Sequence, residues 1–496
     1  MDGSPLFTPT LQADTAAPLP VTIAPGDGIG PEIMQATLTI LAAAGAQIAP
    51  EVVTIGERSY LAGEPTGIGA DAWDSLARTK LLLKGPITTP QGGGYKSVNV
   101  TLRKTLGLFA NIRPCRALHP VVPTKHPDLD VIIIRENEED LYAGIEHQQT
   151  DEVVQCLKLI SRPGTERIVR YGFEVAAAAG IDKVSCFTKD NIMKLTDGLF
   201  HRVFDEVSAQ YPAIKTEHLI VDIGAARLAD QPGRFKLVIL PNLYGDILSD
   251  VAAEIAGSVG LAGSANIGSH GALFEAIHGS APDIAGQDSA NPSGLLCAAI
   301  MMLAQNGQAP VAARIEAAWL RTLEDGIHTL DIFAADRSKA CVGTQGFAEA
   351  VIARLGQQPR QFDLRLSHPL PTVPPSPTRQ PKAEKTMDGV DLFLHWSGGT
   401  PDDLADAVQT IAQAAPGLRL AVITNRGVKV WPKGRDETFC TDHWRCRFMA
   451  APGVTVSPAL VPGLLQALAK AGLPAIKMEM LFRFDGTPGY TAAQGQ

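Results

Sequence analysis

The chain has 496 residues, of which 45% are hydrophobic and 19% charged, and its formal net charge is −9. This length exceeds that of one ordinary core, so we expect a large α/β unit and at least one further domain. The acidic balance argues against a nucleic-acid binder, and no uncharged apolar run approaches the roughly 18 residues that a membrane span requires. The seven cysteines show no CxxC spacing, which argues against a disulfide framework or a zinc site and favours a reducing compartment, the cytoplasm.

Strand-like and helix-like segments alternate through most of the chain. Residues 1–19 hold two aspartates and no lysine or arginine, which predicts a loose arm rather than a targeting signal. Apolar periodicity predicts helices at 33–44 and 166–179. Strands are predicted at 21–24, 80–85, 130–136, 183–187, 218–222 and 236–242, several of them continuously apolar as buried strands are. The alternation predicts an open α/β sheet over residues 20–355.

A proline-rich stretch follows this region. Residues 356–386 hold seven prolines and almost no helical periodicity, which predicts a semi-rigid linker. Beyond it, residues 387–496 are predicted to form a small α/β domain, with strands at 390–396, 418–424 and 428–431 and helices at 402–414 and 457–471. This domain carries no plausible catalytic cluster, and we expect it to serve oligomer assembly.

The first predicted strand runs into a glycine-rich turn, Gly26-Asp27-Gly28-Ile29-Gly30. The turn lacks the G-x-G-x-x-G spacing that sets a helix terminus against a pyrophosphate, so it does not support a standard Rossmann site. A tight turn between strand and helix explains these glycines at least as well.

Charge is distributed unevenly along the chain. No Asp or Glu lies between Asp74 and Asp128, whereas the same stretch holds nine Lys or Arg residues. A solvated basic face is the plainer interpretation. The three consecutive glycines at 92–94 and the small polar residues near them favour instead a site for a small polyanion, because glycines let the backbone approach a ligand closely.

Five polar side chains near this stretch are suited to such a ligand. Ser97 and Asn99 are one strand period apart and would face the same way in extended backbone, and Arg103 follows at short range. Arg113 and Arg135 add planar guanidinium groups, which bind carboxylates through two parallel hydrogen bonds. A tricarboxylate needs several such donors.

Three aspartates suggest a metal site. Asp246 and Asp250 are four residues apart near the start of a predicted helix, and two oxygen ligands at that spacing suit Mg²⁺ or Mn²⁺. Compensation of the helix dipole is the alternative explanation for this pair. Asp222 ends the predicted strand 218–222, where α/β sheets place their ligands, and this favours the metal site.

Together these motifs resemble those of the β-decarboxylating dehydrogenases, the family of isocitrate, 3-isopropylmalate, homoisocitrate and tartrate dehydrogenases. The resemblance spans about residues 20–355. It rests on GDGIGPE, GPITTPQGGGYKSVNVTLR, IIIRENEEDLYAGIE, NIMKLTDGLF, NLYGDILSD and FEAIHGSAPDIAGQDSANP. It implies the isopropylmalate dehydrogenase-like open sheet rather than a standard Rossmann fold. The tail resembles the extra C-terminal domain of a subset of bacterial isocitrate dehydrogenases.

Carried onto this sequence, the resemblance implies four sets of site residues. The catalytic set is Tyr142, Lys194 and Asp222. The substrate-binding set is Thr89, Ser97, Asn99, Arg103, Arg113 and Arg135, and within the family the Ser97-x-Asn99 pair is typical of enzymes that act on isocitrate. Mg²⁺ or Mn²⁺ would be held by Asp222, Asp246 and Asp250. The cofactor-binding set is Thr88, Glu275, His278, Gly279, Ala281, Asp283, Ile284 and Asn291.

The implied reaction is the oxidative decarboxylation of isocitrate to 2-oxoglutarate and CO₂, a step of the tricarboxylic acid cycle. Lys194 with an aspartate would help to remove the substrate's hydroxyl proton, and Tyr142 would protonate the enolate that remains after CO₂ leaves. Lys194 and Asp222 would come from the second protomer of a homodimer or higher homo-oligomer. Asp283 and Ile284 resemble the pair found in NAD enzymes rather than the Lys-Tyr pair of NADP enzymes, so NAD is the expected cofactor.

Two alternatives remain open at this point. One is an NAD-dependent homoisocitrate or 3-isopropylmalate dehydrogenase, which relative rates on the three substrates would distinguish. The other is a non-catalytic regulatory subunit that binds isocitrate. Such a subunit should have lost part of the catalytic and metal-binding set, whereas this chain retains all of it, namely Tyr142, Lys194, Asp222, Asp246 and Asp250. Ser97 could also be a phosphorylation site, since a phosphate of about −1.5 to −2 charges would repel an anionic substrate.

Overall fold

The computed structural model describes residues 17–89, 96–375, 381–413 and 417–495. The chain divides into two compact units, which are Met1–Tyr142 with Leu159–Pro377, and Ala143–Lys158 with Thr378–Gln496. Nearly all of the predicted arm and the three glycines at 92–94 lie outside the described residues. No helix of the described part is both long and apolar enough to cross a membrane.

One mixed sheet of ten strands forms the centre of the first unit, in the order β2-β1-β3-β12-β11-β4-β5-β10-β8-β9. Its strands are β1 (Leu19–Ala24), β2 (Ile48–Val52), β3 (Leu81–Lys84), β4 (Ala110–Arg116), β5 (Asp130–Glu136), β8 (Lys183–Thr188), β9 (Lys215–Ile220), β10 (Leu237–Leu240), β11 (Gly263–Ile267) and β12 (Ala272–Ala276). Pairing is parallel at both ends of the sheet, but β11 runs antiparallel to β12 and β4, and β4 runs antiparallel to β5. The predicted open α/β sheet that is not a standard Rossmann fold is therefore confirmed.

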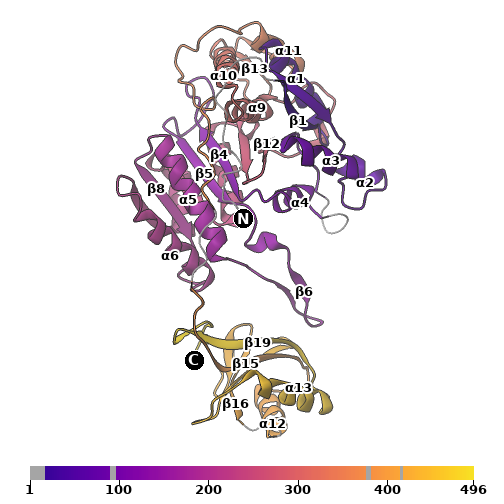
Figure 1. The fold of residues 1–496 in the computed structure, drawn as a ribbon, viewed down its shortest axis with the longest axis vertical. Helices are drawn as coiled ribbons and strands as arrows, with labels where there is room; N and C mark the ends of the chain where they lie inside the picture. Colours follow the sequence, from indigo (N-terminus) through magenta and orange to yellow (C-terminus); the bar gives the residue numbers. More distant parts are fainter. Residues whose placement is uncertain (1–16, 90–95, 376–380, 414–416, 496) are drawn as a thin grey trace. The chain divides into compact units, whose positions relative to one another are not determined.

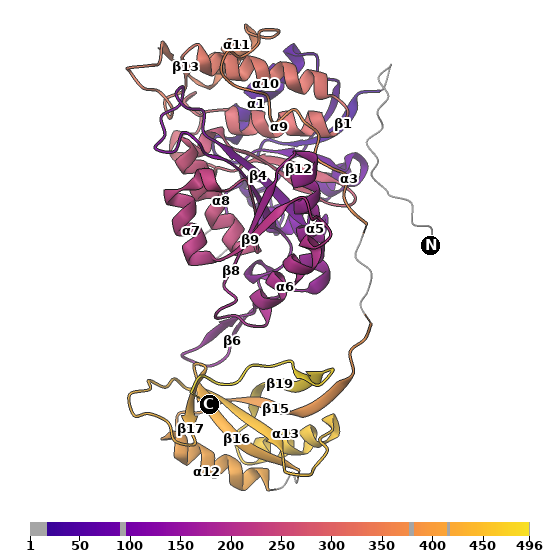
Figure 2. The ribbon, with the colours of Figure 1, turned by 90° about the vertical axis from the view of Figure 1, so that its left-hand side faces the viewer.

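Helices cover both faces of this sheet. They are α1 (Gly30–Ala43), α2 (Glu57–Leu61), α3 (Ala70–Thr79), α4 (Val98–Thr105), α5 (Arg162–Ala178), α6 (Thr196–Ser208), α7 (Val221–Asp230), α8 (Asn242–Ala256), α9 (Ser293–Gln305), α10 (Ala309–Glu324) and α11 (Thr344–Ile352). In the first unit, α1, α9, α10 and α11 gather at one end, while α5 and α6 lie near β8 (Figure 1). Figure 2 shows α7 and α8 on one side of β8 and β9 and α5 on the other. A short parallel pair, β13 (Ile327–His328) and β14 (Ala340–Cys341), lies apart from the main sheet.

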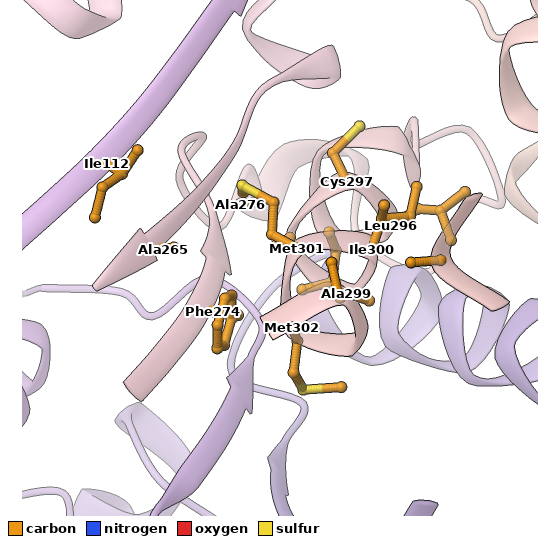
Figure 3. Close-up of a cluster of buried hydrophobic side chains, with 14 of the residues drawn as sticks. Ile112, Ala265, Phe274, Ala276, Leu296, Cys297, Ala299, Ile300, Met301 and Met302 are labelled. Atoms are coloured by element: carbon orange, nitrogen blue, oxygen red, sulfur yellow. The ribbon is translucent and has the colours of Figure 1, made fainter. Parts of the chain in front are cut away.

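Helix α9 is the most deeply buried helix of the core. All of its residues are buried, and its apolar side chains continue around the whole helix, as expected for a helix enclosed by other elements. Phe274 and Ala276 of β12 lie beside Met301 and Met302 of α9 in the main hydrophobic cluster (Figure 3). This packing holds the middle of the sheet, where the candidate site residues originate.

Two local predictions are corrected by the structure. The strand predicted at 218–222 ends at Ile220, and Asp222 lies instead in the first turn of α7, because β9 is a partly exposed edge strand that gives way to the helix. The extended geometry assumed for Ser97 and Asn99 is also wrong. Ser97 is the N-cap of α4 and accepts a hydrogen bond from the backbone N–H of Val100, the role for which serine is strongly preferred.

The second unit contains an antiparallel sheet in the order β17-β16-β18-β15-β19-β20, with two helices. Its elements are β15 (Lys385–His395), α12 (Pro401–Ala412), β16 (Leu418–Asn425), β17 (Val428–Trp431), β18 (His443–Ala450), α13 (Val461–Lys470), β19 (Ala475–Phe484) and β20 (Thr487–Pro488). Leu392 and Phe448 of the sheet share one buried core with Leu404 of α12 and Leu464 of α13. A small C-terminal α/β domain is thus confirmed, although the sequence pattern had missed β18 and β19.

A hairpin from the middle of the chain belongs to this second unit. Its strands are β6 (Glu146–Gln148) and β7 (Val154–Cys156). The hydroxyl of Thr150 donates to the carboxylate of Asp442, and the backbone N–H of Asp442 donates to Glu152 at 3.0 Å. Because these contacts tie the hairpin to the C-terminal strands, the first unit departs from the continuous region predicted over 20–355.

The beginning of the predicted linker packs onto the first unit. Glu316 of α10 is buried, and its carboxylate accepts hydrogen bonds from the backbone N–H groups of Arg365, Leu366 and Ser367 at 2.6, 2.9 and 2.9 Å. These bonds satisfy three backbone donors that no helix or strand satisfies. Residues 365–367 are therefore anchored rather than free.

Replacing Glu316→Gln tests this anchor. Only one oxygen of the amide can accept, so at least one buried backbone N–H loses its partner, at a cost of about 1–3 kcal/mol of unfolding free energy. Urea unfolding followed by circular dichroism measures the loss. Glu324→Gln is the matched control, because Glu324 also accepts two backbone N–H groups, from Arg360 and Gln361, but in exposed surroundings. Equal losses of unfolding free energy for the two variants would contradict the role of Glu316 as a buried anchor of residues 365–367.

Candidate active site

Five side chains from neighbouring elements converge beside the middle of the ten-stranded sheet. Arg113 comes from β4, Arg135 from β5, Tyr142 from the short 3₁₀ helix after β5, and Asp246 and Asp250 from α8. Arg113 Nη2 lies 3.3 Å from Asp246 Oδ1, and its Nη1 lies 3.1 Å from Asp250 Oδ1. Arg135 also donates to Asp246, as does the hydroxyl of Tyr142. The structure therefore unites arginines and carboxylates that are far apart in the sequence.

Strand register and helix spacing explain this convergence. Arg113 is directly opposite Ile133 in the antiparallel pair β4 and β5, so Arg135, two residues further along β5, points to the same face. Asp246 and Asp250 face the two arginines because they are one helical turn apart. Gly245 allows α8 to approach β5, since a Cβ at this position would lie 2.6 Å from Arg135 Cγ.

Two further residues that the sequence motifs did not single out orient the arginines. Arg135 Nη2 donates to Asn242 Oδ1 at 2.7 Å, and Arg113 Nη1 donates to the hydroxyl of Ser249 at 2.6 Å. Both residues lie on α8, four residues before and three residues after Asp246. Helical spacing from Asp246 was the one signal in the sequence that could have identified them.

The mixture of charges shifts the pKa values of the cluster. Burial, reinforced by the charges of Arg113 and Arg103, lowers the pKa of Arg135 to about 9. Burial by itself would raise the pKa of Asp246, but Arg135 and Arg113 outweigh it and hold this pKa below its usual value. Burial and the hydrogen bond to Asp246 raise the pKa of Tyr142, so the phenol keeps its proton at neutral pH and can donate it.

A second ion-pair network holds Arg103 in place. Glu275 of β12 lies 2.8 Å from both Lys84 Nζ and Arg103 Nη2, and all three side chains are buried. Burial would raise the pKa of Glu275, but Lys84 and Arg103 hold it well below its ordinary range. Predicted to bind cofactor, Glu275 is engaged here in positioning Arg103. Arg103 Nε and Asn99 Oδ1 are buried polar atoms without a hydrogen-bond partner among the described residues, and both can bind a ligand.

The donor set of the cluster fits a divalent metal ion in part. Asp246 and Asp250 offer carboxylate oxygens side by side, which suit Mg²⁺ or Mn²⁺. Asp222 lies elsewhere in the chain fold, where its carboxylate is 67% exposed and 3.1 Å from Lys189 Nζ. Lys194 is likewise exposed, on the loop between β8 and α6. Within the described part of one chain, no group of three or more closely spaced metal-ligating side chains includes Asp222 or Asp246.

The glycine-rich turn holds the predicted cofactor loop in place. The backbone N–H of Ile29 donates to Ser280 O at 2.9 Å, and the hydroxyls of Thr88 and Ser280 are 2.9 Å apart. Gly28 has a φ of +57°, and a Cβ there would lie 1.9 Å from Ser280 O. The turn therefore packs tightly against the backbone of the loop instead of leaving room for a pyrophosphate, which agrees with the tight-turn interpretation.

The remaining predicted cofactor residues lie on the loop between β12 and α9. His278 Nδ1 is 3.0 Å from Gly279 O, and its Nε2 is buried without a partner in the described part of the chain. Ala281 adopts a left-handed backbone with φ of 38° and precedes the 3₁₀ turn Pro282–Ile284, on which Asp283 is exposed.

The two remaining predicted binding residues, Asn291 and Thr89, differ in their surroundings. Asn291 donates to Asp331 at 3.0 Å and accepts from the backbone N–H of Ser293 at 2.9 Å, so its amide supports the start of α9. Thr89 is exposed next to the residues that the structure does not describe. No contact therefore assigns either residue to a ligand.

Comparisons with known proteins agree over both units. Residues 20–351 match the model of the isocitrate/isopropylmalate dehydrogenase family, and residues 385–496 match that of the bacterial isocitrate dehydrogenase C-terminal domain. A protein of Rickettsia bellii named isocitrate dehydrogenase [NADP] is 52% identical over 481 residues, which cover 96% of this chain and 99% of that protein. One of Thermus thermophilus with the same name is 42% identical, with 96% of each chain covered.

Solved structures show the same similarity. A crystal structure of a Thermus thermophilus protein superposes with a TM-score of 0.91 at 42% identity, and covers 96% of both chains. The isocitrate dehydrogenase of Methylococcus capsulatus superposes with a TM-score of 0.65 at 42% identity, over 68% of this chain and 99% of its own.

These names overturn the expectation of an NAD-dependent enzyme, because the relatives that span nearly the whole chain at 42–52% identity are named for NADP. The expectation depended on the single motif residue Asp283. That side chain is exposed and has no hydrogen-bond partner within the described residues, so it can turn away from a phosphate.

Replacing Glu275→Gln tests the network beneath the site. Loss of the carboxylate leaves the buried cations of Lys84 and Arg103 without a counter-charge, and such losses cost about 3–5 kcal/mol of unfolding free energy. Glu51→Gln is the matched control, because Glu51 also accepts from an arginine, Arg78, but in a solvent-exposed pair that contributes little to stability. Denaturant unfolding compares the two variants, and a Glu275 loss no greater than the control would contradict a buried counter-charge role.

Proposed function

The chain belongs to the isocitrate/isopropylmalate dehydrogenase family, and from this premise we propose that it oxidatively decarboxylates isocitrate to 2-oxoglutarate and CO₂ with reduction of NADP. The observation that carries the proposal is the facing arrangement of Arg113 and Arg135 with Asp246 and Asp250. Arginines bind substrate carboxylates through paired hydrogen bonds, while neighbouring aspartates hold a divalent ion. A chelating polycarboxylate satisfies both halves of this site at once.

The substrate would take the place of contacts that the arginines now make with the aspartates. Arg113 and Arg135 would turn from Asp246 to the carboxylates of isocitrate, and Arg103 would offer its unpartnered Nε. Ser97 and Asn99, at the start of α4, would contact the carboxylate that distinguishes isocitrate from 3-isopropylmalate. This exchange keeps each buried cation paired with a carboxylate before and after binding.

Asp246 and Asp250 would hold the divalent ion together with an oxygen ligand from Asp222 of a second protomer. Such an ion polarises a bound hydroxyl and stabilises negative charge that develops on oxygen. Tyr142 would act as the general acid of the last step, because its phenol is protonated at neutral pH and lies beside Asp246 at the edge of the same site.

Lys194 and Asp222 would enter the site of a second copy of the chain in a homodimer. Both are exposed here, and exposed apolar side chains accompany them, namely Ile192 on the same loop as Lys194, Ile223 on α7 and Ile247 on α8. Exposed apolar groups on these elements favour contact with another protein surface. Lys194 would then help to remove the hydroxyl proton of the substrate.

Steady-state kinetics test the substrate and the cofactor. With Mg²⁺ present, kcat/KM is expected to be highest for isocitrate among isocitrate, homoisocitrate and 3-isopropylmalate, and higher with NADP than with NAD. EDTA should abolish turnover, and Mg²⁺ or Mn²⁺ should restore it. A preference for 3-isopropylmalate would refute the substrate assignment, and isocitrate binding without turnover would favour a regulatory subunit.

Mixing two inactive variants tests the shared site. Lys194→Met and Asp250→Asn should each lower kcat by at least about 100-fold, the usual minimum for a lost acid–base or metal-binding group. Refolded together, they form mixed dimers in which one of the two sites is intact, so about a quarter of the wild-type activity should return.

The matched control mixes Tyr142→Phe with Asp250→Asn. Because both of these residues belong to the cluster of a single chain, mixed dimers should contain no intact site and recover no activity. Native mass spectrometry verifies that mixed dimers form. If mixed dimers form in the Lys194→Met mixture but activity does not return, Lys194 belongs to the site of its own chain.

A further inference from the structure

Strand β19 leaves one side of its backbone open over most of its length. It pairs with β15 along one side from Ala475 to Phe484. On the other side, β20 pairs only with Arg483 and Phe484, and Gly489 donates to Phe482 O. Among the described residues, no strand or bridge pairs with the outer side of residues 475–481. An open edge of this kind can accept another strand.

The open stretch lacks the features that usually protect a sheet edge. Ile476 and Met478 are 39% and 48% exposed, and no proline interrupts residues 475–481. The one lysine, Lys477, does not protect the edge, because its ammonium group donates to Gln155 at 3.0 Å and lies over the ring of Phe393. Long apolar edges are usually covered by a partner.

Charges along β19 select the partner strand. A second copy of the chain can pair with this edge in antiparallel orientation, about a twofold axis normal to the sheet. Such an axis passes between two directly opposed residues, so one residue of β19 must lie opposite the same residue of the other copy. Directly opposed side chains point to the same face and therefore contact each other. An axis at Lys477 would oppose two lysines, and an axis at Glu479 would oppose two glutamates. An axis at Met478 opposes each Lys477 with a Glu479 of the other strand, and it also centres on the open stretch 475–481.

We propose that β19 pairs antiparallel with β19 of a second copy of this chain, in the register that places Met478 opposite Met478. The two six-stranded sheets then become continuous across a twofold axis, and the exposed side chains of Ile476 and Met478 are covered. Glu479 is 55% exposed and already lies 3.0 Å from Lys477 of its own chain, and it gains a second lysine partner from the other chain. This contact is independent of the proposed reaction, since no residue of the candidate active site takes part.

Disulfide trapping in the full-length chain tests the register. Met478→Cys is introduced into a chain whose exposed Cys156 and Cys341 are replaced by serine. Opposed residues of an antiparallel pair have Cα atoms about 4.5–5.5 Å apart, within the range of a disulfide. The matched control is Ile476→Cys, an exposed residue of the same face whose twofold mate would lie about 13 Å away.

Mild oxidation should give roughly ten-fold more covalent dimer from Met478→Cys than from Ile476→Cys on a non-reducing gel. Activity on isocitrate, measured in parallel, should be retained in both variants. The proposal would be overturned if Met478→Cys gave no more covalent dimer than the Ile476→Cys control. It would also be overturned if neither variant formed any covalent dimer. Neither result would affect the assignment of the reaction.

Charge reversal supplies a second, independent test. In the Met478→Cys background, Glu479→Lys opposes like charges and should lower the yield of covalent dimer roughly ten-fold, since both charge pairs are lost. Adding Lys477→Glu restores opposite charges in the same register and should restore the yield. The control Glu437→Lys makes the same charge change on an exposed loop of the same unit and should leave the yield unchanged. Failure of the double reversal to restore it would refute the register.

Discussion

Every buried cation in the first unit requires a carboxylate within contact distance, and the architecture of the site follows from that requirement. Lys84 and Arg103 share Glu275, while Arg113 and Arg135 share Asp246. An unpaired charge in such surroundings costs several kcal/mol, so these pairs determine which strands and helices can be neighbours. They also define the chemistry, because an anionic ligand can replace a protein carboxylate as the partner of an arginine without leaving a buried charge alone.

The two ion-pair networks differ in whether their charged side chains can exchange partners. Glu275 is enclosed between two buried cations and cannot exchange partners without stranding Lys84. Asp246 is partly exposed and Asp250 more so, and in the proposed reaction Arg113 and Arg135 would turn to the substrate while the aspartates turned to a metal ion. In the proposed reaction, the first network would be the rigid support for Arg103, and the second would be the part of the site that rearranges on binding.

The second unit presents a different physical problem. Its sheet has a well-packed core but, among the residues that the structure describes, an open edge at β19, and unpaired backbone groups there favour pairing with another strand. The alternation of Lys477, Met478 and Glu479 makes that edge complementary to itself in one register. In the proposed pairing, the second unit would contribute to assembly through backbone hydrogen bonding and two charge pairs.

The amino-acid sequence by itself determined the elements whose physics is local. Continuous apolar runs identified β5 at residues 130–136, helical periodicity identified α1 and α5, and the proline-rich stretch separated the C-terminal domain. The motifs also predicted that Asp246 and Asp250 share one face of a helix, because spacing of four residues is sufficient to establish this. The family resemblance supplied the reaction class, which no local pattern could.

Only the tertiary structure determined which residues and elements contact one another. The early end of β9 shortened the strand predicted at 218–222, and helix capping at Ser97 replaced the extended backbone considered for Ser97 and Asn99, since a terminus depends on what packs beside it. Asn242 and Ser249 became site residues through the approach of α8 to β5, and Glu275 was assigned to Lys84 and Arg103 by a parallel pairing of β3 with β12. The hairpin at 146–156 joined the C-terminal strands in the same way. Contacts of this kind link residues more than a hundred positions apart, so no window of sequence contains them.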